Sequence, residues 1–166
     1  MPTAMTHRTT LVTGMSATGK STVLRALAGL GCDAVDTDEP GPDGAWIETV
    51  DGEPLWRLDR IRALLDQPRS QPLVVQGTVA NQGALYDRFD AIVLLSAPAD
   101  VILERLRTRT TNDFGKHADE RAQVLRDLAE VEPLLRAGAT HEIDATQPLD
   151  VVVAAVLTIA VGSDRA

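Results

Sequence analysis

The 166-residue sequence has one cysteine, few aromatic residues and an excess of acidic over basic side chains. The single cysteine, Cys32, excludes an intrachain disulfide and is typical of a protein from a reducing compartment. Aromatic residues make up 3% of the chain, too few for a protein that stacks the bases of single-stranded nucleic acid. Sixteen Lys and Arg against 24 Asp and Glu give a net charge of −8, which repels phosphate backbones. Nucleic acid is therefore not an expected partner, whereas a small anionic ligand needs only a local concentration of positive charge.

Long hydrophobic runs are also missing. The first ten residues contain no apolar run of the kind found in signal peptides. The longest apolar stretch, residues 149–161, carries Asp150 and is shorter than the roughly 20 residues that span a bilayer. We expect a soluble cytoplasmic protein without a membrane partner, folded as one domain over residues 1–166 and present as a monomer or a homodimer.

Short β-branched runs alternate along the chain with helical patterns. The patterns predict strands at 9–13, 32–36, 72–76, 91–95 and 141–144 and helices at 20–30, 55–66, 98–107, 119–136 and 148–161. This alternation predicts an α/β fold with a five-stranded parallel sheet covered by helices on both faces. Ligands of such sheets bind beyond the carboxyl ends of the strands.

Two segments lack such patterns. Residues 39–54 are rich in proline, glycine and acidic residues and are expected to form a long irregular loop. Residues 108–118 are polar, without apolar periodicity, and are expected to be mobile or open without ligand.

Residues 14–21, GMSATGKS, match the phosphate-loop pattern G-x-x-x-x-G-K-[ST] between a predicted strand and a predicted helix. Gly14 and Gly19 let the backbone curl so that successive N–H groups face an anion, and the helix adds its positive end. Lys20 is expected to reach the β- and γ-phosphates, and the Ser21 hydroxyl to hold magnesium. We therefore predict that the chain binds ATP and Mg²⁺, with further contacts from Ala17, Thr18 and Thr22.

Lysine occurs only at Lys20 and Lys116, against fourteen arginines. A compact ammonium group suits a position between phosphates, which explains its retention at Lys20. Lys116 stands in the polar segment before the predicted helix 119–136, where a solvated loop lysine is an equally reasonable interpretation.

Asp36 and Asp38 follow the second predicted strand, and their i, i+2 spacing places both on one side of the chain. Beside a phosphate loop, Asp36 can hold magnesium or its waters, and Asp38 can orient and deprotonate an acceptor hydroxyl. Gln76 stands where many P-loop proteins carry an acidic residue, so the magnesium role falls more heavily on Asp36. The alternative is a pair of turn or capping aspartates.

Together these motifs resemble the shikimate kinase branch of the nucleoside monophosphate kinase-like P-loop proteins. Residues 52–57, GEPLWR, are similar to that family's Gly-Glu-x-x-Phe-Arg, which implies that Arg57 grips a substrate carboxylate. Gly77 and Thr78 lie where the family has its three-glycine substrate loop. Residues 39–57 would then form the acceptor-side loop, where Trp46 and Trp56 either wall the acceptor pocket or pack in the core.

The same resemblance implies a lid over residues 108–118. Residues 104–109, ERLRTR, are similar to the helix end that enters the lid in this family. The resemblance implies that Arg105 packs on the adenine and that Arg109 reaches the phosphates. Arg109 and Lys116 are expected to close from the lid, exclude water and neutralise the charge of the transferred group.

The sequence departs from the shikimate kinase pattern on the acceptor side. Val131 stands where the family has a second arginine that clamps the carboxylate, only Gly77 remains of the three glycines, and the lid reads TNDFGK. Losing half of such a clamp removes charge-assisted hydrogen bonds worth about 1.5–3 kcal/mol each. Shikimate is therefore not the expected acceptor.

The predicted function is that of an ATP- and magnesium-dependent kinase acting on a hydroxyl of a small metabolite or natural product. The predicted catalytic residues are Lys20, Asp38 and Arg109, and the predicted acceptor site comprises Asp38, Trp46, Arg57, Gly77 and Thr78. Two alternatives remain open. A nucleoside or nucleoside monophosphate kinase would, for a phosphorylated acceptor, need several arginines converging on that phosphate, and a nucleotide-binding regulatory ATPase would need a partner surface.

Overall fold

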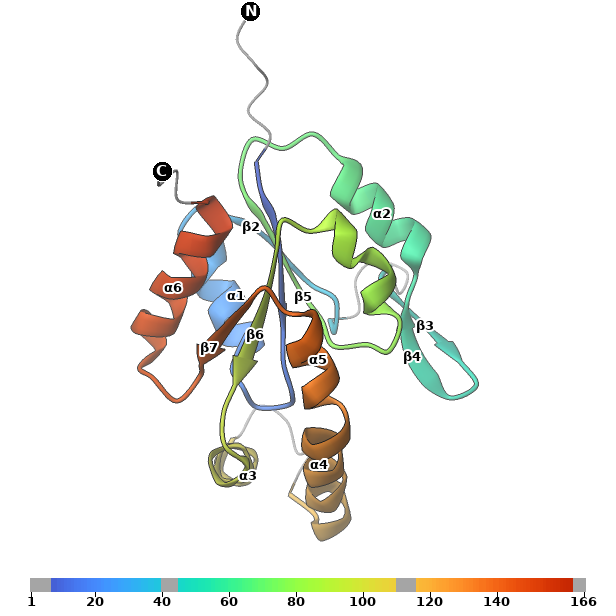
Figure 1. Cartoon of the computed structure of the whole chain (residues 1–166), viewed down its shortest axis with the longest axis vertical. Helices are drawn as coiled ribbons and strands as arrows, with labels where there is room; N and C mark the ends of the chain where they lie inside the picture. The colour runs from blue at the N-terminus through green and yellow to red at the C-terminus, as the bar shows by residue number, and fades with distance from the viewer. Residues whose placement is uncertain (1–6, 40–44, 110–115, 163–166) are drawn as a thin grey trace, which may run out of the picture.

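The computed structural model describes residues 7–39, 45–109 and 116–162. Its centre is a five-stranded, all-parallel sheet with the strand order β2-β5-β1-β6-β7 (Figure 1). The strands are β1 (Thr9–Thr13), β2 (Asp33–Asp36), β5 (Leu73–Gln76), β6 (Ala91–Ser96) and β7 (His141–Asp144). The predicted α/β class and five-stranded parallel sheet are confirmed.

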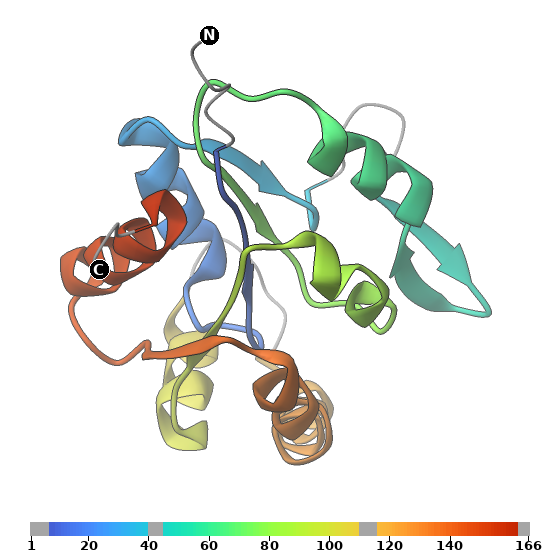
Figure 2. The same cartoon turned by 45° about the horizontal axis from the view of Figure 1, so that its top comes forward.

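Helices cover both faces of this sheet. The helices α1 (Lys20–Gly29) and α6 (Leu149–Val161) lie on one face, and α2 (Leu58–Asp66) and the 3₁₀ helix η1 (Gln82–Arg88) lie on the other (Figures 1 and 2). Side chains alternate between the faces with period two. On β1, Val12 packs into the core beneath α1 and α6, whereas Leu11 packs into the core that holds α2.

Three more helices lie at or beside the end of the sheet where the strands finish. They are α3 (Ala99–Thr108), α4 (Ala118–Glu130) and α5 (Glu132–Gly138), seen in the lower part of Figure 1. The side chain of Leu135 in α5 packs with Met15 and Leu94 in a small separate cluster. Met15 belongs to the predicted phosphate loop, so α5 supports that loop from one side.

The prediction of an irregular loop over residues 39–54 is wrong for its second half. Strands β3 (Ile47–Val50) and β4 (Glu53–Trp56) pair antiparallel as a hairpin. Asp51 and Gly52 both have positive φ, at 52° and 80°, the backbone that a two-residue Asp-Gly hairpin turn requires. Residues 40–44 lie outside the described residues.

Two predicted helices differ from the structure for local reasons. The helix predicted at 55–66 begins only at Leu58, because residues 55 and 56 belong to β4. The helix predicted at 119–136 is divided into α4 and α5 around Val131. Pro133 causes this division, since proline lacks an N–H and its ring clashes with the carbonyl four residues earlier in a continuous helix. The sequence patterns did not predict η1.

Within the described ranges, none of the helices combines the length and hydrophobicity that crossing a membrane requires.

Candidate functional site

The predicted phosphate loop connects β1 to α1 at the carboxyl edge of the sheet. Gly14 lies so close to β6 that an added Cβ would meet the carbonyl oxygen of Leu95 at 2.5 Å. Gly19 has a φ of 94° and occupies the N-cap of α1. Ala17 has a φ of 63°, a left-handed conformation that non-glycine residues adopt at a cost of about 1–2 kcal/mol. Backbone strain of this kind concentrates at ligand-binding loops.

Two threonine side chains fix the shape of the loop. The Thr18 hydroxyl is buried and donates to the carbonyl of Met15 at 2.9 Å. The Thr78 hydroxyl, from the segment after β5, donates to the carbonyl of Gly14 at 2.7 Å and accepts from the Gly14 N–H at 3.3 Å. The structure thus places Thr78, a predicted acceptor ligand, against the first residue of the phosphate loop.

The ammonium group of Lys20 folds back over the loop. Its Nζ donates to the carbonyls of Gly14 at 2.7 Å and Met15 at 3.0 Å. Burial lowers the pKa of Lys20 to about 8, although the negative charges of Asp38 and Asp36 oppose this shift. A desolvated cation whose hydrogen bonds to the described residues go to neutral carbonyls is a favourable site for an anionic ligand.

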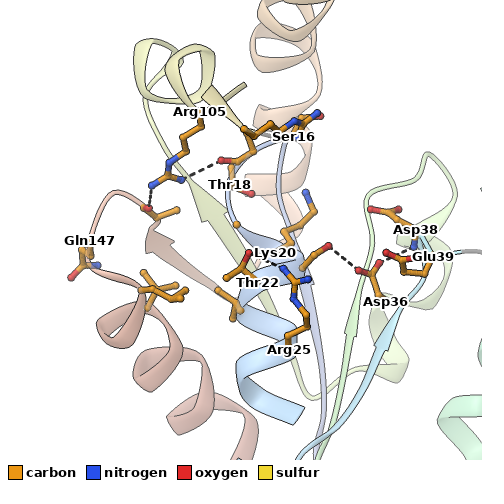
Figure 3. A pocket seen from close by; sticks show the side chains of 18 residues that line it. Ser16, Thr18, Lys20, Thr22, Arg25, Asp36, Asp38, Glu39, Arg105 and Gln147 are labelled. Atoms are coloured by element: carbon orange, nitrogen blue, oxygen red, sulfur yellow. Dashed lines mark hydrogen bonds between the residues drawn. The ribbon is translucent and has the colours of Figure 1, made fainter. Parts of the chain in front are cut away.

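A cavity of about 760 Å³ opens over the loop and the start of α1. Four cationic side chains line it, namely Lys20, Arg25, Arg105 and Arg109. Three carboxylates also line the cavity, so in a chain of net charge −8 the lining is only slightly positive as a whole. Figure 3 shows Arg105 and Gln147 on one side of Lys20 and three acidic side chains, Asp36, Asp38 and Glu39, on the other. The predicted nucleotide residues Ala17, Thr18, Gly19, Ser21 and Thr22 also line the cavity.

Arg105, from α3, joins the phosphate loop to the end of β7. Its guanidinium donates to the carbonyls of Ala17 at 3.2 Å and Ala145 at 2.6 Å. Beside it the cavity is lined by Gln147, Leu149 and Val152, from the segment after β7 and the start of α6. This end of the cavity therefore combines a fixed guanidinium with apolar surface, an arrangement suited to a planar heterocyclic base.

Asp36 and Asp38 stand at the opposite end, where β2 finishes. The Ser21 hydroxyl donates to Oδ2 of Asp36 at 2.8 Å, and the N–H of Asp38 donates to Oδ1 of Asp36 at 3.0 Å. The side-chain amide of Gln76 donates to Oδ1 of Asp36 and, at 3.0 Å, to Oδ2 of Asp38. The structure thus brings the two predicted aspartates to the rim of the predicted nucleotide site.

The oxygen atoms of Ser21 and Asp36 fit a magnesium site that a nucleotide completes. Among the described residues no three His, Cys, Asp or Glu side chains could hold a metal ion by themselves. Magnesium is typically bound through one or two carboxylates together with substrate phosphates, not in an all-protein cage. A single carboxylate in contact with the phosphate-loop serine matches that pattern.

The remaining predicted acceptor residues do not line the cavity. Trp46 is half-buried and packs against the core that holds α2, and the Arg57 Nε donates to the carbonyl of Ile47 at 3.3 Å. Gly77 is packed so closely that an added Cβ would meet Thr37 Oγ1 at 2.5 Å and Trp56 Cζ2 at 3.0 Å. Trp56 itself is fully buried, so of the two interpretations given for it, core packing holds.

Lys116 belongs to the predicted lid, and Val131 stands at the position of the second clamp arginine of the shikimate kinases. The Lys116 side chain is exposed, does not line the cavity and donates to the carbonyl of Arg107 at 3.2 Å. Val131 packs against the cluster of Met15, Leu94 and Leu135, next to the phosphate loop. Residues 110–115 of the predicted lid lie outside the described residues.

Sequence reasoning missed several residues of the cavity. Arg25 lies four residues after Ser21, so its position one helical turn along α1 could have indicated it. Gln147, Leu149 and Val152 follow the last strand of the sheet, where the general rule for ligand sites in parallel sheets points. The side chains of Asn81 and Gln82, in the segment after β5, bond Trp56, Thr13 and Tyr86 within the protein.

Known proteins resemble the chain both in sequence and in fold. A family described as an AAA domain matches residues 11–126. A shikimate kinase from Halorhodospira halophila is 32% identical over 146 residues, covering 80% of this chain and 81% of that protein.

Solved structures show the same fold. A shikimate kinase from Acinetobacter baumannii in complex with shikimate aligns with a TM-score of 0.65 at 21% identity, over 93% of each chain. A gluconokinase from Sinorhizobium meliloti aligns with a TM-score of 0.56 at 22% identity, over 93% of this chain and 94% of that one. The fold therefore serves kinases with different acceptors.

Proposed function

The chain belongs to the P-loop kinases related to shikimate kinase, and we propose that it transfers the γ-phosphoryl group of ATP to a hydroxyl of a small metabolite or natural product other than shikimate. One observation carries the proposal. The phosphate loop with Lys20 and the carboxylates of Asp36 and Asp38 share one cavity, with the Ser21 hydroxyl 2.8 Å from Oδ2 of Asp36. Phosphoryl transfer to an alcohol requires a phosphate cradle, a magnesium ligand and a group that orients the attacking hydroxyl.

The phosphate loop binds the triphosphate in this proposal. The Lys20 ammonium exchanges the carbonyls of Gly14 and Met15 for the β- and γ-phosphate oxygens. Negatively charged acceptors thereby replace neutral ones, which strengthens its hydrogen bonds. Ser21 and Asp36 would hold magnesium, which would neutralise charge on the phosphates. Arg109 lies on the same cavity and adds positive charge near the transferred group, and Lys116 is proposed to approach from the lid.

Arg105, Leu149 and Val152 receive the base. The guanidinium of Arg105 is fixed by the carbonyls of Ala17 and Ala145, so it presents one face to a flat ligand. Leu149 is 48% exposed although it is apolar, and it lines the cavity. Stacking an adenine between these groups buries this apolar surface, and each Å² buried contributes about 25 cal/mol to binding.

Asp38 acts on the acceptor. Among the described residues no group hydrogen-bonds to its Oδ1, whereas Oδ2 accepts from Gln76. Oδ1 accepts the proton of the acceptor hydroxyl while the hydroxyl oxygen bonds to the γ-phosphorus. The bond from phosphorus to the β–γ bridging oxygen breaks, and ADP leaves with that oxygen.

The acceptor side argues against shikimate. A carboxylate held by two guanidinium groups needs a second cation opposite Arg57, and the sequence has Val131 at the position where the shikimate kinases carry it. Val131 packs on Met15, Leu94 and Leu135, so its surroundings are apolar and unsuited to a charge. This supports an acceptor without a carboxylate at the position that the second guanidinium holds in the shikimate kinases.

Measurement of ADP release against a panel of alcohols, sugars, nucleosides and aminoglycoside-like compounds tests the proposal. The wild-type protein should release ADP faster with at least one acceptor than with water alone, and Lys20→Met should lose this stimulation while remaining folded by circular dichroism. Stimulation that survives in Lys20→Met would show that the phosphate loop is not the catalytic site. Release that no acceptor changes in the wild-type protein would favour a regulatory ATPase.

A further inference from the structure

Gln76 lies at the carboxyl end of β5, between the ends of β1 and β2. In the sheet register its Cα is paired with Val12 on one side and with Asp36 on the other. Its side chain is fully buried, and its amide nitrogen donates to Oδ1 of Asp36 and to Oδ2 of Asp38. In the part of the chain that the structure describes, no other side chain bonds both aspartates.

The other end of the same amide has no partner. The Oε1 of Gln76 is buried, and no described group donates to it. A methionine would fill a similar volume without burying an unsatisfied carbonyl, and would therefore suit packing alone better than glutamine. The glutamine is consequently explained by its two N–H donors and not by its shape.

The contacts of the two carboxylates differ in number. Asp36 accepts from the Ser21 hydroxyl, the Asp38 N–H and the Gln76 amide, so both of its oxygens are held. Asp38 is exposed, and of the described residues only Gln76 donates to its carboxylate, through Oδ2. Its Oδ1 therefore owes its direction to that one bond.

We propose that Gln76 is a positioning residue that gives the two aspartates their separate roles. Its amide fixes Asp36 against Ser21 on the nucleotide side and turns Asp38 so that Oδ1 faces the acceptor. A glutamate here could not donate to either carboxylate and would add a third negative charge beside them. This inference rests on the proposed phosphoryl transfer and adds the residue that aligns its acceptor-side carboxylate.

Two variants separate alignment from packing. Gln76→Met removes both donors at similar volume, and Gln76→Glu keeps the shape but replaces the donors with acceptors. We expect kcat with the acceptor to fall by about 10–100-fold in each, the range expected when a reacting group is displaced by about 1 Å. The affinity for ATP in the absence of magnesium should change by less than about twofold, because the hydrogen bonds of the Gln76 side chain to described residues go to the two aspartates and not to the phosphate loop.

Gln82→Met is the matched control. Gln82 is also buried, and its amide donates to the Thr13 hydroxyl and the Tyr86 hydroxyl and not to the aspartates. This variant also removes buried side-chain hydrogen bonds at similar volume, and it should not show the selective loss of kcat. An equal loss of kcat in both variants at equal loss of stability would show that Gln76 acts through packing alone.

A double-mutant cycle between Gln76→Met and Asp38→Asn decides the proposal, with Gln76→Glu taking the place of Gln76→Met if the latter does not fold. If Gln76 acts through Asp38, its replacement should lower kcat by less than about threefold in the Asp38→Asn background. Effects that multiply fully would overturn the inference while leaving the kinase function intact. A wild-type protein that transfers no phosphoryl group would instead refute the proposed function, so the two failures are distinguishable.

Discussion

At the sheet's carboxyl edge, the side with the phosphate loop, which we call the nucleotide half after its proposed role, and the side with Thr37, Asp38 and Trp56, which we call the acceptor half, are built in different ways. The nucleotide half rests on a continuous segment, residues 16–23, all of which line one cavity. The acceptor half joins residues far apart in sequence. The Asn81 side chain accepts from the Trp56 N–H at 2.9 Å and donates to the Trp56 carbonyl at 3.0 Å, and the Trp56 Nε1 donates to Thr37 Oγ1 at 3.0 Å.

This difference determines which polar groups each half can offer to a ligand. In the nucleotide half, the Lys20 ammonium and the Arg25 and Arg109 side chains line an open cavity where a ligand can reach them. In the acceptor half, Thr37 donates onward to the carbonyl of Gln76 at 2.7 Å, so the polar groups of Trp56, Thr37 and Asn81 are used within the protein. The acceptor half therefore contains a structural hydrogen-bond network and few polar groups that a ligand can reach. The exposed carboxylate of Asp38 is one of these groups.

The largest expected effect separates the two aspartates at the boundary of the halves. Asp38→Asn should lower kcat with the acceptor by about 10²–10⁴, the usual contribution of a general base, and leave ATP binding almost unchanged. Asp36→Asn should instead raise the magnesium concentration needed for half-maximal activity. Steady-state kinetics and calorimetric titration of ATP with magnesium measure both. Full turnover in Asp38→Asn together with its loss in Asp36→Asn would reverse the assignment.

A smaller effect is expected where the acceptor half is packed most tightly. Gly77→Ala places a Cβ 2.5 Å from Thr37 Oγ1 and 3.0 Å from Trp56 Cζ2, and should lower the free energy of unfolding by about 1–3 kcal/mol. Gly83→Ala in η1 is the matched control, because its Cβ would have no neighbour within 4 Å. Urea denaturation compares the two. Equal stability of both variants would mean that the Trp56–Gly77 contact is not tight in solution.

The burial of Lys20 in the nucleotide half should be measurable in the pH dependence of stability. Burial lowers the pKa of Lys20 from 10.5 to about 8, so below pH 8 the folded protein holds a charged, desolvated lysine. Between pH 8 and 10.5 the unfolded chain binds more protons at this position than the folded one, so the Lys20 contribution to stability rises with pH. Lys20→Met should flatten that rise in urea titrations without nucleotide. The exposed Lys116→Met should keep it, and parallel curves for wild type and Lys20→Met would contradict the account.

The smallest effect concerns backbone strain in the phosphate loop. Ala17 has a φ of 63°, which glycine adopts freely, so Ala17→Gly should stabilise the nucleotide-free protein by about 0.5 kcal/mol. Ala154→Gly, in the interior of α6 and exposed, should destabilise it by about 0.5–1 kcal/mol. Thermal unfolding resolves both, since 1 kcal/mol shifts the midpoint of a chain of this size by about 2–4 °C. A lower midpoint for Ala17→Gly would show that the loop conformation is unstrained.

The contrast between the halves also explains how far the sequence could be interpreted. The central sheet was predictable because β-branched runs and helical periodicity are local signals, and the motif of residues 14–21 placed Lys20 and Ser21 at the end of a strand. Asp36 and Asp38 were found for the same reason, since they directly follow β2.

The acceptor half could not be predicted in the same way. The bonds of Asn81 to Trp56 and of Gln76 to Asp36 join residues 25 and 40 positions apart, and no local pattern indicates such contacts. The roles of Gly77 and Thr78 depend on what the fold packs against them. The hairpin β3–β4 did carry a local signal, Asp51-Gly52, but the surrounding prolines and glycines concealed it.

We propose that the nucleotide half is that of a shikimate kinase relative, whereas the acceptor half does not suit shikimate. The most direct test measures transfer of labelled γ-phosphate from ATP to shikimate and to the best acceptor of the panel, on the same enzyme preparation. We expect phosphorylated product from that acceptor and a kcat/KM for shikimate below ~10⁴ M⁻¹s⁻¹, the low end of ordinary enzymes. A higher kcat/KM for shikimate than for every other acceptor would contradict the account, because it would show that Arg57 holds the carboxylate without a partner at position 131.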